Sequence, residues 1–305
     1  MSVGLCEGRR CLVADSRVKK EVAATAQPCK FWQHSIGQYS FYMQIGTTTR
    51  NMPTADLVAA DHENAGTFRG MNAGPSWPQA LLEVCLCSGA PTQLLIGGIL
   101  ALFGLRAGPS GHVTLQLLAS LAGLDTLILV GLVFALLVAG GESPRRVLLG
   151  TRPVAGEVLR GFGLVPWVFL LAVVAGMVLM RWAPGLFKPN PFATIASTRM
   201  DFVLLGVVVV LAGGVREEIQ RAFILHRFEQ RLGGALVGVL GFGVIFGLGH
   251  YLQGWSVVIV TTLLGTLWSV VYLARRSVIA PMVSHASFNL IEVIGFGLVA
   301  WAGWA

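Results

Sequence analysis

The fold is decided by residues 202–252, which read FVLLGVVVVLAGGVREEIQRAFILHRFEQRLGGALVGVLGFGVIFGLGHYL. It contains two apolar runs, at about 202–224 and 234–252. A charged stretch and the pair Gly233-Gly234 separate them. A hydrocarbon layer about 30 Å thick is crossed by roughly 20 residues of helix, which is the length of each run. The stretch therefore predicts two membrane helices that fold back on each other at Gly233-Gly234, where glycine permits a tight turn.

The rest of the chain extends this pattern. Of its 305 residues, 54% are hydrophobic and 12% are charged, whereas about a quarter are charged in ordinary soluble domains. Only helices and closed barrels satisfy the backbone in lipid, and these segments lack the alternation of a barrel. We expect an all-α, polytopic transmembrane bundle of about seven spans, in the cell membrane with the lipid bilayer as a partner. The further segments are 80–105, 113–140, 162–182, 255–274 and 277–303.

The net charge of +7 does not point to nucleic acid, because Lys and Arg fall mostly in the links between apolar segments. Successive links fall on alternate sides, with eight basic residues on one side and four on the other. The richer side is expected to be cytoplasmic. That side holds Arg145, Arg146, Arg152, Arg160, Arg227, Arg231, Arg275 and Arg276, and the other holds Arg106, Arg181, Lys188 and Arg199.

Three parts follow along the chain. Residues 1–78 show no sustained helical or strand period, so we expect a poorly ordered leader, with an overlong choice of start site as one explanation. Residues 79–199 hold the first transmembrane helices, and 200–305 hold the polar motifs described next. All five cysteines lie in the first 87 residues, in a number and spacing that suit neither a disulfide framework nor a zinc site.

Polar groups interrupt three of the spans. Ionisable side chains inside a bilayer are costly and indicate function. Each also has a plainer explanation: an ion pair where a helix leaves the lipid, a histidine bonded to a carbonyl, or an amide that holds two helices together. The groups are Glu217, Glu218 and Arg221 in the fourth segment, His250 in the fifth, and His285 with Asn289 in the seventh.

Folding the hairpin predicts that these groups meet. Glu217 and His250 are equally far from the Gly233-Gly234 turn, each about 25 Å along a helix. His285 and Asn289 are four residues apart and so lie on one helical face. A carboxylate and an imidazole can polarise a water as general base, while an imidazole and an amide can stabilise an oxyanion. The set is suited to hydrolysing an amide without a Ser or Cys nucleophile.

The two glutamates are both candidates for the base. Glu217 precedes Arg221 by four residues and is expected to be its ion-pair partner. Glu218 lies about 100° further round the helix and is then freer to accept a proton.

The order of these motifs over about residues 200–295 resembles the CAAX protease and bacteriocin-processing (Abi) family, whose patterns are EExxxR, FxxxH and HxxxN or HxxxD. Phe246 with His250 and His285 with Asn289 match. The first pattern departs, because alignment on Arg221 puts Arg216 in the position of the first glutamate. A helix bulge at Gly213-Gly214 or beyond could restore either glutamate to the site.

This resemblance implies an intramembrane endopeptidase that acts on peptide or protein substrates at the membrane by a metal-free glutamate mechanism. A zinc protease is a rival, with Glu217 or Glu218, His250 and His285 as ligands, although the usual HExxH signature is absent. We therefore expect no cofactor and leave zinc open. A noncatalytic membrane scaffold of the same fold is the other alternative. Asp125, inside the second segment, has no assigned role.

Overall fold

The computed structural model describes residues 5–7, 10–12, 74–108, 113–188 and 195–302. The chain divides into two units, Met1–Thr67 and Phe68–Ala305. In the first, strand β1 (Leu5–Glu7) pairs antiparallel with β2 (Arg10–Leu12), and Glu7 lies opposite Arg10. This short hairpin does not test the prediction of a poorly ordered leader over residues 1–78, which stays a prediction. The prediction for residues 13–73 lies outside the described residues.

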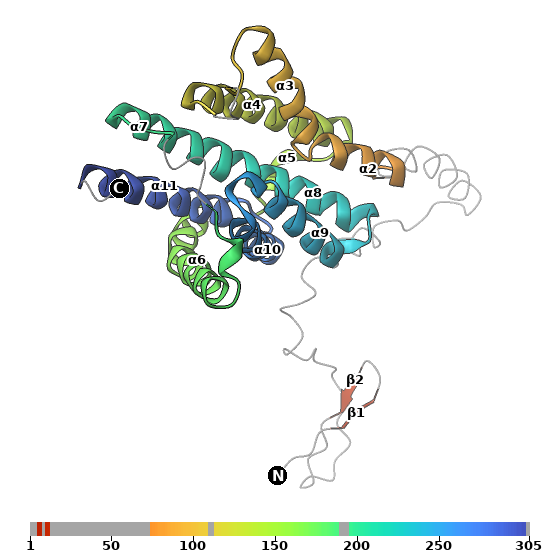
Figure 1. Cartoon of the computed structure of the whole chain (residues 1–305). Coiled ribbons are helices and arrows are strands. Elements are labelled where there is room, and N and C mark those ends of the chain that lie inside the picture. The colour runs from red at the N-terminus through yellow and green to blue at the C-terminus, as the bar shows by residue number, and fades with distance from the viewer. Residues whose placement is uncertain (1–4, 8–9, 13–73, 109–112, 189–194, 303–305) are drawn as a thin grey trace, which may run out of the picture. The chain divides into compact units, whose positions relative to one another are not determined.

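The second unit is all-helical in its described residues, as predicted (Figure 1). All seven predicted segments coincide with helices. These are α2 (Trp77–Leu86) with α3 (Ala90–Leu102), α4 (Leu115–Ala139), α6 (Val154–Trp182), the continuous series α7 (Arg199–Val208), η4 (Val209–Arg216) and α8 (Glu217–Arg231), then α9 (Gly234–Leu248), α10 (Trp255–Arg275) and α11 (Ile279–Trp301). Short helices α5 (Pro144–Leu148), η3 (Pro184–Leu186) and η5 (Tyr251–Gln253) lie in the links.

In the part of the chain that the structure describes, five helices are long and apolar enough to cross a membrane, namely Trp77–Leu102, α4, α6, α10 and Ile279–Val299 within α11, and α9 is apolar but shorter. The protein is therefore a multi-pass membrane protein. The predicted fourth span lies in the series α7–η4–α8, in which α8 carries many charges. Helix α6 begins at Val154, earlier than predicted, because Glu157 in its first turn is neutralised by Arg275 at 2.6 Å.

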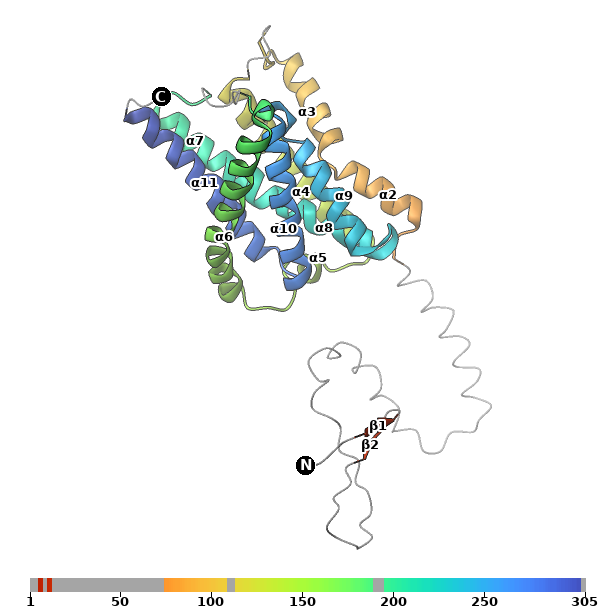
Figure 2. The same cartoon turned by 60° about the horizontal axis from the view of Figure 1, so that its bottom comes forward.

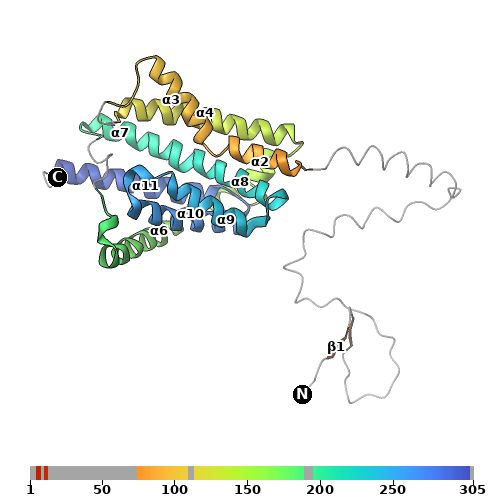
Figure 3. The ribbon, with the colours of Figure 1, turned by 45° about the vertical axis from the view of Figure 1, so that its right-hand side comes forward.

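The series α7–η4–α8 runs through the middle of the bundle, with α4 on one side and α11 on the other (Figures 1 and 3). Helices α9 and α10 pack on each other, and α6 covers α10 and α11 (Figure 2). The predicted turn is present, since Gly233 and Gly234 have φ of 93° and 88°. Among the side chains that fill the core between these helices are Leu129, Phe223, Leu225, Trp268 and Phe288.

The links predicted to share one side of the membrane contact one another. Arg276 forms an ion pair with Glu229 at the end of α8, and Arg152 donates to the carbonyl of Arg275 at 3.0 Å. Arg227 bonds Glu142 in the link before α5. The basic side of the bundle is thus a connected surface, and we expect it to be cytoplasmic.

Candidate active site

A bulge of the kind that the sequence allowed is present as the π-helix η4, which contains Gly213 and Gly214. Both glycines face α11 so closely that a side chain would collide. A Cβ on Gly214 would lie 2.6 Å from the Cβ of Ala286, and one on Gly213 would overlap the Asn289 amide nitrogen. The π-helix therefore brings the backbone before Glu217 directly against the face of α11 that carries His285 and Asn289.

Glu218 forms the ion pair with Arg221, and its Oε1 lies 2.8 Å from Nδ1 of His285. The expected pairing of Glu217 with Arg221 is wrong. The reason is the position of the guanidinium, which lies over the rings of Phe246 at 4.9 Å and Trp268 at 5.6 Å. In this position the guanidinium reaches the carboxylate of Glu218, three residues earlier on the same helix. The same carboxylate also contacts His285 of α11.

This cluster is deeply buried. Glu218 is 1% exposed, Arg221 0% and His285 4%. A buried carboxylate needs a compensating charge, which Arg221 provides here. Because a carboxylate can only accept, Nδ1 of His285 carries the hydrogen and donates it to Glu218. The imidazole is thereby held with Nε2 directed away from Glu218.

Glu217 is the accessible carboxylate of the pair. Its side chain is 18% exposed, and its Oε2 lies 3.8 Å from Nε2 of His285, a separation that a water can bridge. The Asn289 amide lies beside the same stretch, over Gly213. The structure thus brings together Glu217, Glu218, Arg221, His285 and Asn289, as the sequence predicted.

His250 is linked to this group through Phe246. Helix α9 ends at Leu248, so His250 is not on the helix as expected, because glycines at 247 and 249 weaken its last turn. Its Nδ1 lies 3.0 Å from the Phe246 carbonyl. The Phe246 ring is near both histidines, with its centroid 5.1 Å from that of His250 and 6.1 Å from that of His285.

Trp268 of α10 is a site residue that the sequence did not reveal. Its ring stacks on His285 with centroids 3.8 Å apart and an interplanar angle of 19°. Its indole nitrogen donates to Ser284 at 3.1 Å, which fixes the ring. No spacing rule links Trp268 to His285, because they belong to different helices. The stack fixes the plane of the imidazole, while the hydrogen bond to Glu218 fixes which ring nitrogen carries the hydrogen.

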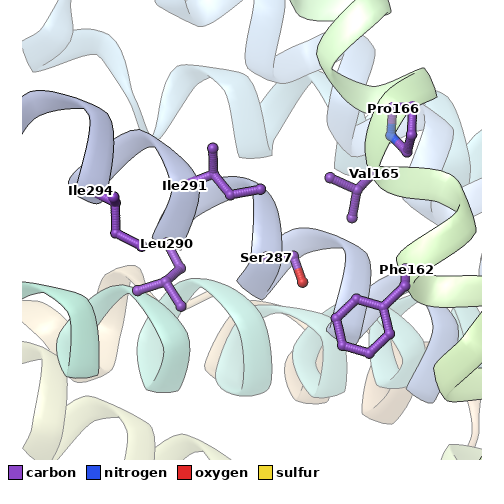
Figure 4. Close-up of a pocket in the computed structure, with 7 residues that line it drawn as sticks. All are labelled: Phe162, Val165, Pro166, Ser287, Leu290, Ile291 and Ile294. Carbon is purple, nitrogen blue, oxygen red and sulfur yellow. The ribbon is translucent and has the colours of Figure 1, made fainter.

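Two apolar pockets flank α11, and neither is lined by a predicted site residue. One of about 410 Å³ lies between α6 and α11, where Phe162, Val165 and Pro166 face Ser287, Leu290, Ile291 and Ile294 (Figure 4). The other, of about 760 Å³, lies between α7–η4 and α11. Leu290 and Ile294 line both pockets and are exposed, so both pockets open on the outer surface of the bundle.

Within the described ranges, no group of three His, Cys, Asp or Glu side chains is arranged to hold a metal ion. The zinc alternative required His250, His285 and a glutamate to form such a group.

Comparison with known proteins identifies the domain that carries this site. No curated protein and no solved structure shows significant similarity to the chain. The model of the family described as "Type II CAAX prenyl endopeptidase Rce1-like" matches residues 199–291. That range begins at α7 and includes all six predicted site residues. Residues 199–291 are therefore a domain of the Rce1-like type II CAAX prenyl endopeptidase family, which is a family of peptidases.

Proposed function

We propose that the protein is an endopeptidase of the cell membrane that hydrolyses peptide bonds of membrane-associated peptides or proteins. One observation carries this proposal: the carboxylate of Glu217, the Nε2 of His285 and the amide of Asn289 converge where η4 meets α11. An acceptor for a water proton and two donors for an oxyanion are the groups that amide hydrolysis needs.

Glu217 is the general base in this proposal. A base must reach the water that it deprotonates, and Glu217 is the more exposed of the two glutamates. Glu218 is occupied by Arg221 and by Nδ1 of His285. Its role is to orient and charge His285, in the way that a buried carboxylate orients the histidine of a hydrolytic triad.

The oxyanion donors are His285 and Asn289. A His285 that is protonated on both nitrogens donates Nδ1–H to Glu218 and presents Nε2–H to the substrate. The guanidinium of Arg221 and this imidazolium then balance the two carboxylates, so the cluster is neutral overall. The Asn289 amide supplies the second donor and cannot be deprotonated in the process.

In the reaction, Glu217 takes a proton from a water, whose oxygen forms a bond to the carbonyl carbon. The carbonyl oxygen becomes the oxyanion that His285 and Asn289 stabilise. The C–N bond then breaks, and the proton on Glu217 passes to the leaving amine. His250 assists as a second acceptor for the water, since its Nδ1–H faces the Phe246 carbonyl and leaves Nε2 able to accept.

The test uses purified protein in lipid nanodiscs and a library of peptides, with and without a prenyl group, whose products are identified by mass spectrometry. We expect cleavage that Asn289→Ala lowers by about 10² to 10³-fold, the effect of removing an oxyanion donor. Thermal unfolding of the variant checks that the fold is intact. If no peptide is cleaved, or if folded Asn289→Ala cleaves like the parent, the proposal fails and a scaffold role replaces it.

A further inference from the structure

Arg216, the residue just before the two glutamates, is buried against a part of the chain outside the 199–291 domain. Its Nη2 lies 2.6 Å from Oδ2 of Asp125 in α4, and both side chains are less than a tenth exposed. Asp125 also accepts from Thr92 at 2.5 Å and from Gln93 at 3.3 Å, at the start of α3. The acid that the sequence left unassigned is therefore the counter-ion of Arg216.

The surroundings are shaped for this guanidinium. Gly89 has a φ of 88°, and a Cβ there would overlap Nη2 of Arg216. The other terminal nitrogen donates to Gln220 at 3.1 Å, and Gln220 in turn donates to the Cys87 carbonyl at 2.6 Å. The break between α2 and α3, which the sequence did not predict, thus lies against Arg216.

These contacts fix the end of a strained element. A π-helix is rare and costs more than the α-helix it replaces, so neighbouring contacts must hold it. Gly213 and Gly214 pack it against α11, and the Arg216–Asp125 pair ties its last residue to α4. The extra residue of a π turn shifts the register of the residues on either side by about 100°, the angle that separates Glu217 from Glu218.

We propose that Arg216 and Asp125 are positioning residues whose ion pair holds η4 in its π form and thereby turns Glu217 toward the Nε2 side of His285. The expected effect on turnover rests on the proposed function, whereas the expected effect on the orientation of Glu217 does not. The arginine in the position of the first family glutamate is then a working part of this site, with its counter-ion supplied by an N-terminal helix.

The experiment removes the pair without leaving a buried charge. The double variant Asp125→Leu with Arg216→Met replaces a buried ion pair by apolar groups of similar size, which often preserves stability. The matched control is Glu157→Met with Arg275→Met, which removes an ion pair between α6 and α10 that is remote from η4. Thermal unfolding confirms that each variant is folded, and Asp125→Asn with Arg216→Gln serves if the first double variant is not.

The orientation of residue 217 is measured independently of activity. The measurement is thiol labelling of Glu217→Cys after the five native cysteines are changed to alanine. If residue 217 turns from partly exposed to buried, its labelling rate falls about tenfold or more in the double variant, since thiol reactivity follows exposure. In the double variant that keeps Glu217, kcat falls about 10²-fold, the usual effect of a misplaced group, while KM is unchanged. The Glu157/Arg275 control changes neither quantity.

The outcomes separate this inference from the proposed function. Unchanged labelling and unchanged kcat in the folded double variant overturn the positioning role. Reduced labelling with unchanged kcat supports the role in register and rejects Glu217 as the base. Unchanged labelling with reduced kcat also overturns the inference, because the pair then affects turnover by another route.

Discussion

Nδ1 of His285 lies 2.8 Å from Oε1 of Glu218, and the same oxygen is paired with Arg221. One buried carboxylate thus serves two partners, one on its own helix and one on α11. Glu217, the next residue back, has Oε2 3.8 Å from the other imidazole nitrogen. The two neighbouring glutamates therefore have different tasks, and they should respond differently to the same substitution.

Glu218→Gln should destabilise the protein, because it removes the charge that compensates buried Arg221. The expected loss is about 3 to 5 kcal/mol, as for breaking a buried ion pair from one side. Glu217→Gln should leave stability nearly unchanged, since its carboxylate is partly exposed. Thermal unfolding of both variants in detergent measures the difference. Equal loss in the two, or greater loss for Glu217→Gln, would contradict the assignment of partners.

Gly213→Ala should lower turnover by displacing Asn289, because the new methyl group would overlap the amide nitrogen. Losing one oxyanion donor costs about 10² to 10³ in kcat. Gly163→Ala is the matched control, since a Cβ there meets nothing within 4 Å. Peptide cleavage rates of the two variants are compared. The close approach of η4 to α11 is unimportant to catalysis if Gly213→Ala and Gly163→Ala cleave equally well.

Acid should destabilise the protein partly through Glu142, in the link between α4 and α5. Burial alone would raise the pKa of this carboxyl, but hydrogen bonds from His226 and Arg227 lower it from 4.5 to about 2. A depressed pKa in the folded state gives stability that is complete above about pH 4.5 and is lost as the pH falls toward 2.

The melting temperature of the parent should therefore fall more steeply over that range than that of Glu142→Gln. The comparison is made in one detergent at constant ionic strength. Parallel curves for the two proteins would show that the cluster around Glu142 is not formed in solution.

The helical pattern was predictable because bilayer thickness fixes the length of apolar segments, and Gly233-Gly234 lies at the end of the charged stretch, where a tight turn is expected. The mismatch between Arg216–Arg221 and the family pattern allowed a bulge at Gly213-Gly214 or beyond but did not require one. Tertiary partners were not predictable. Glu217 and Glu218 are both within one turn of Arg221, and only the position of Phe246 and Trp268 decides which one pairs with it.

The same limit explains Asp125 and His250. An acid in an apolar helix indicates a partner but does not name it, and Arg216 lies 91 residues further along the chain. For His250, periodicity extended the helix through Gly249, where the backbone instead turns into η5. The stack of Trp268 on His285 has no local signal at all.

Removal of metal should leave activity unchanged, since Glu217 and the two donors need no ion in the proposed reaction. Exhaustive chelation followed by the peptide assay measures this directly, with elemental analysis of the purified protein. One tightly bound zinc that is lost together with activity in His250→Ala would favour the zinc protease over the glutamate mechanism.

The most direct test of the account is the kcat of Glu217→Gln on a peptide that the parent protein cleaves, measured in nanodiscs with the melting temperature recorded on the same sample. General-base catalysis contributes about 10² to 10⁴-fold, so we expect kcat to fall by that factor while the melting temperature stays within error of the parent. A folded Glu217→Gln that cleaves at the parental rate would contradict the account, because no other accessible carboxylate in the described site could then be identified as the base.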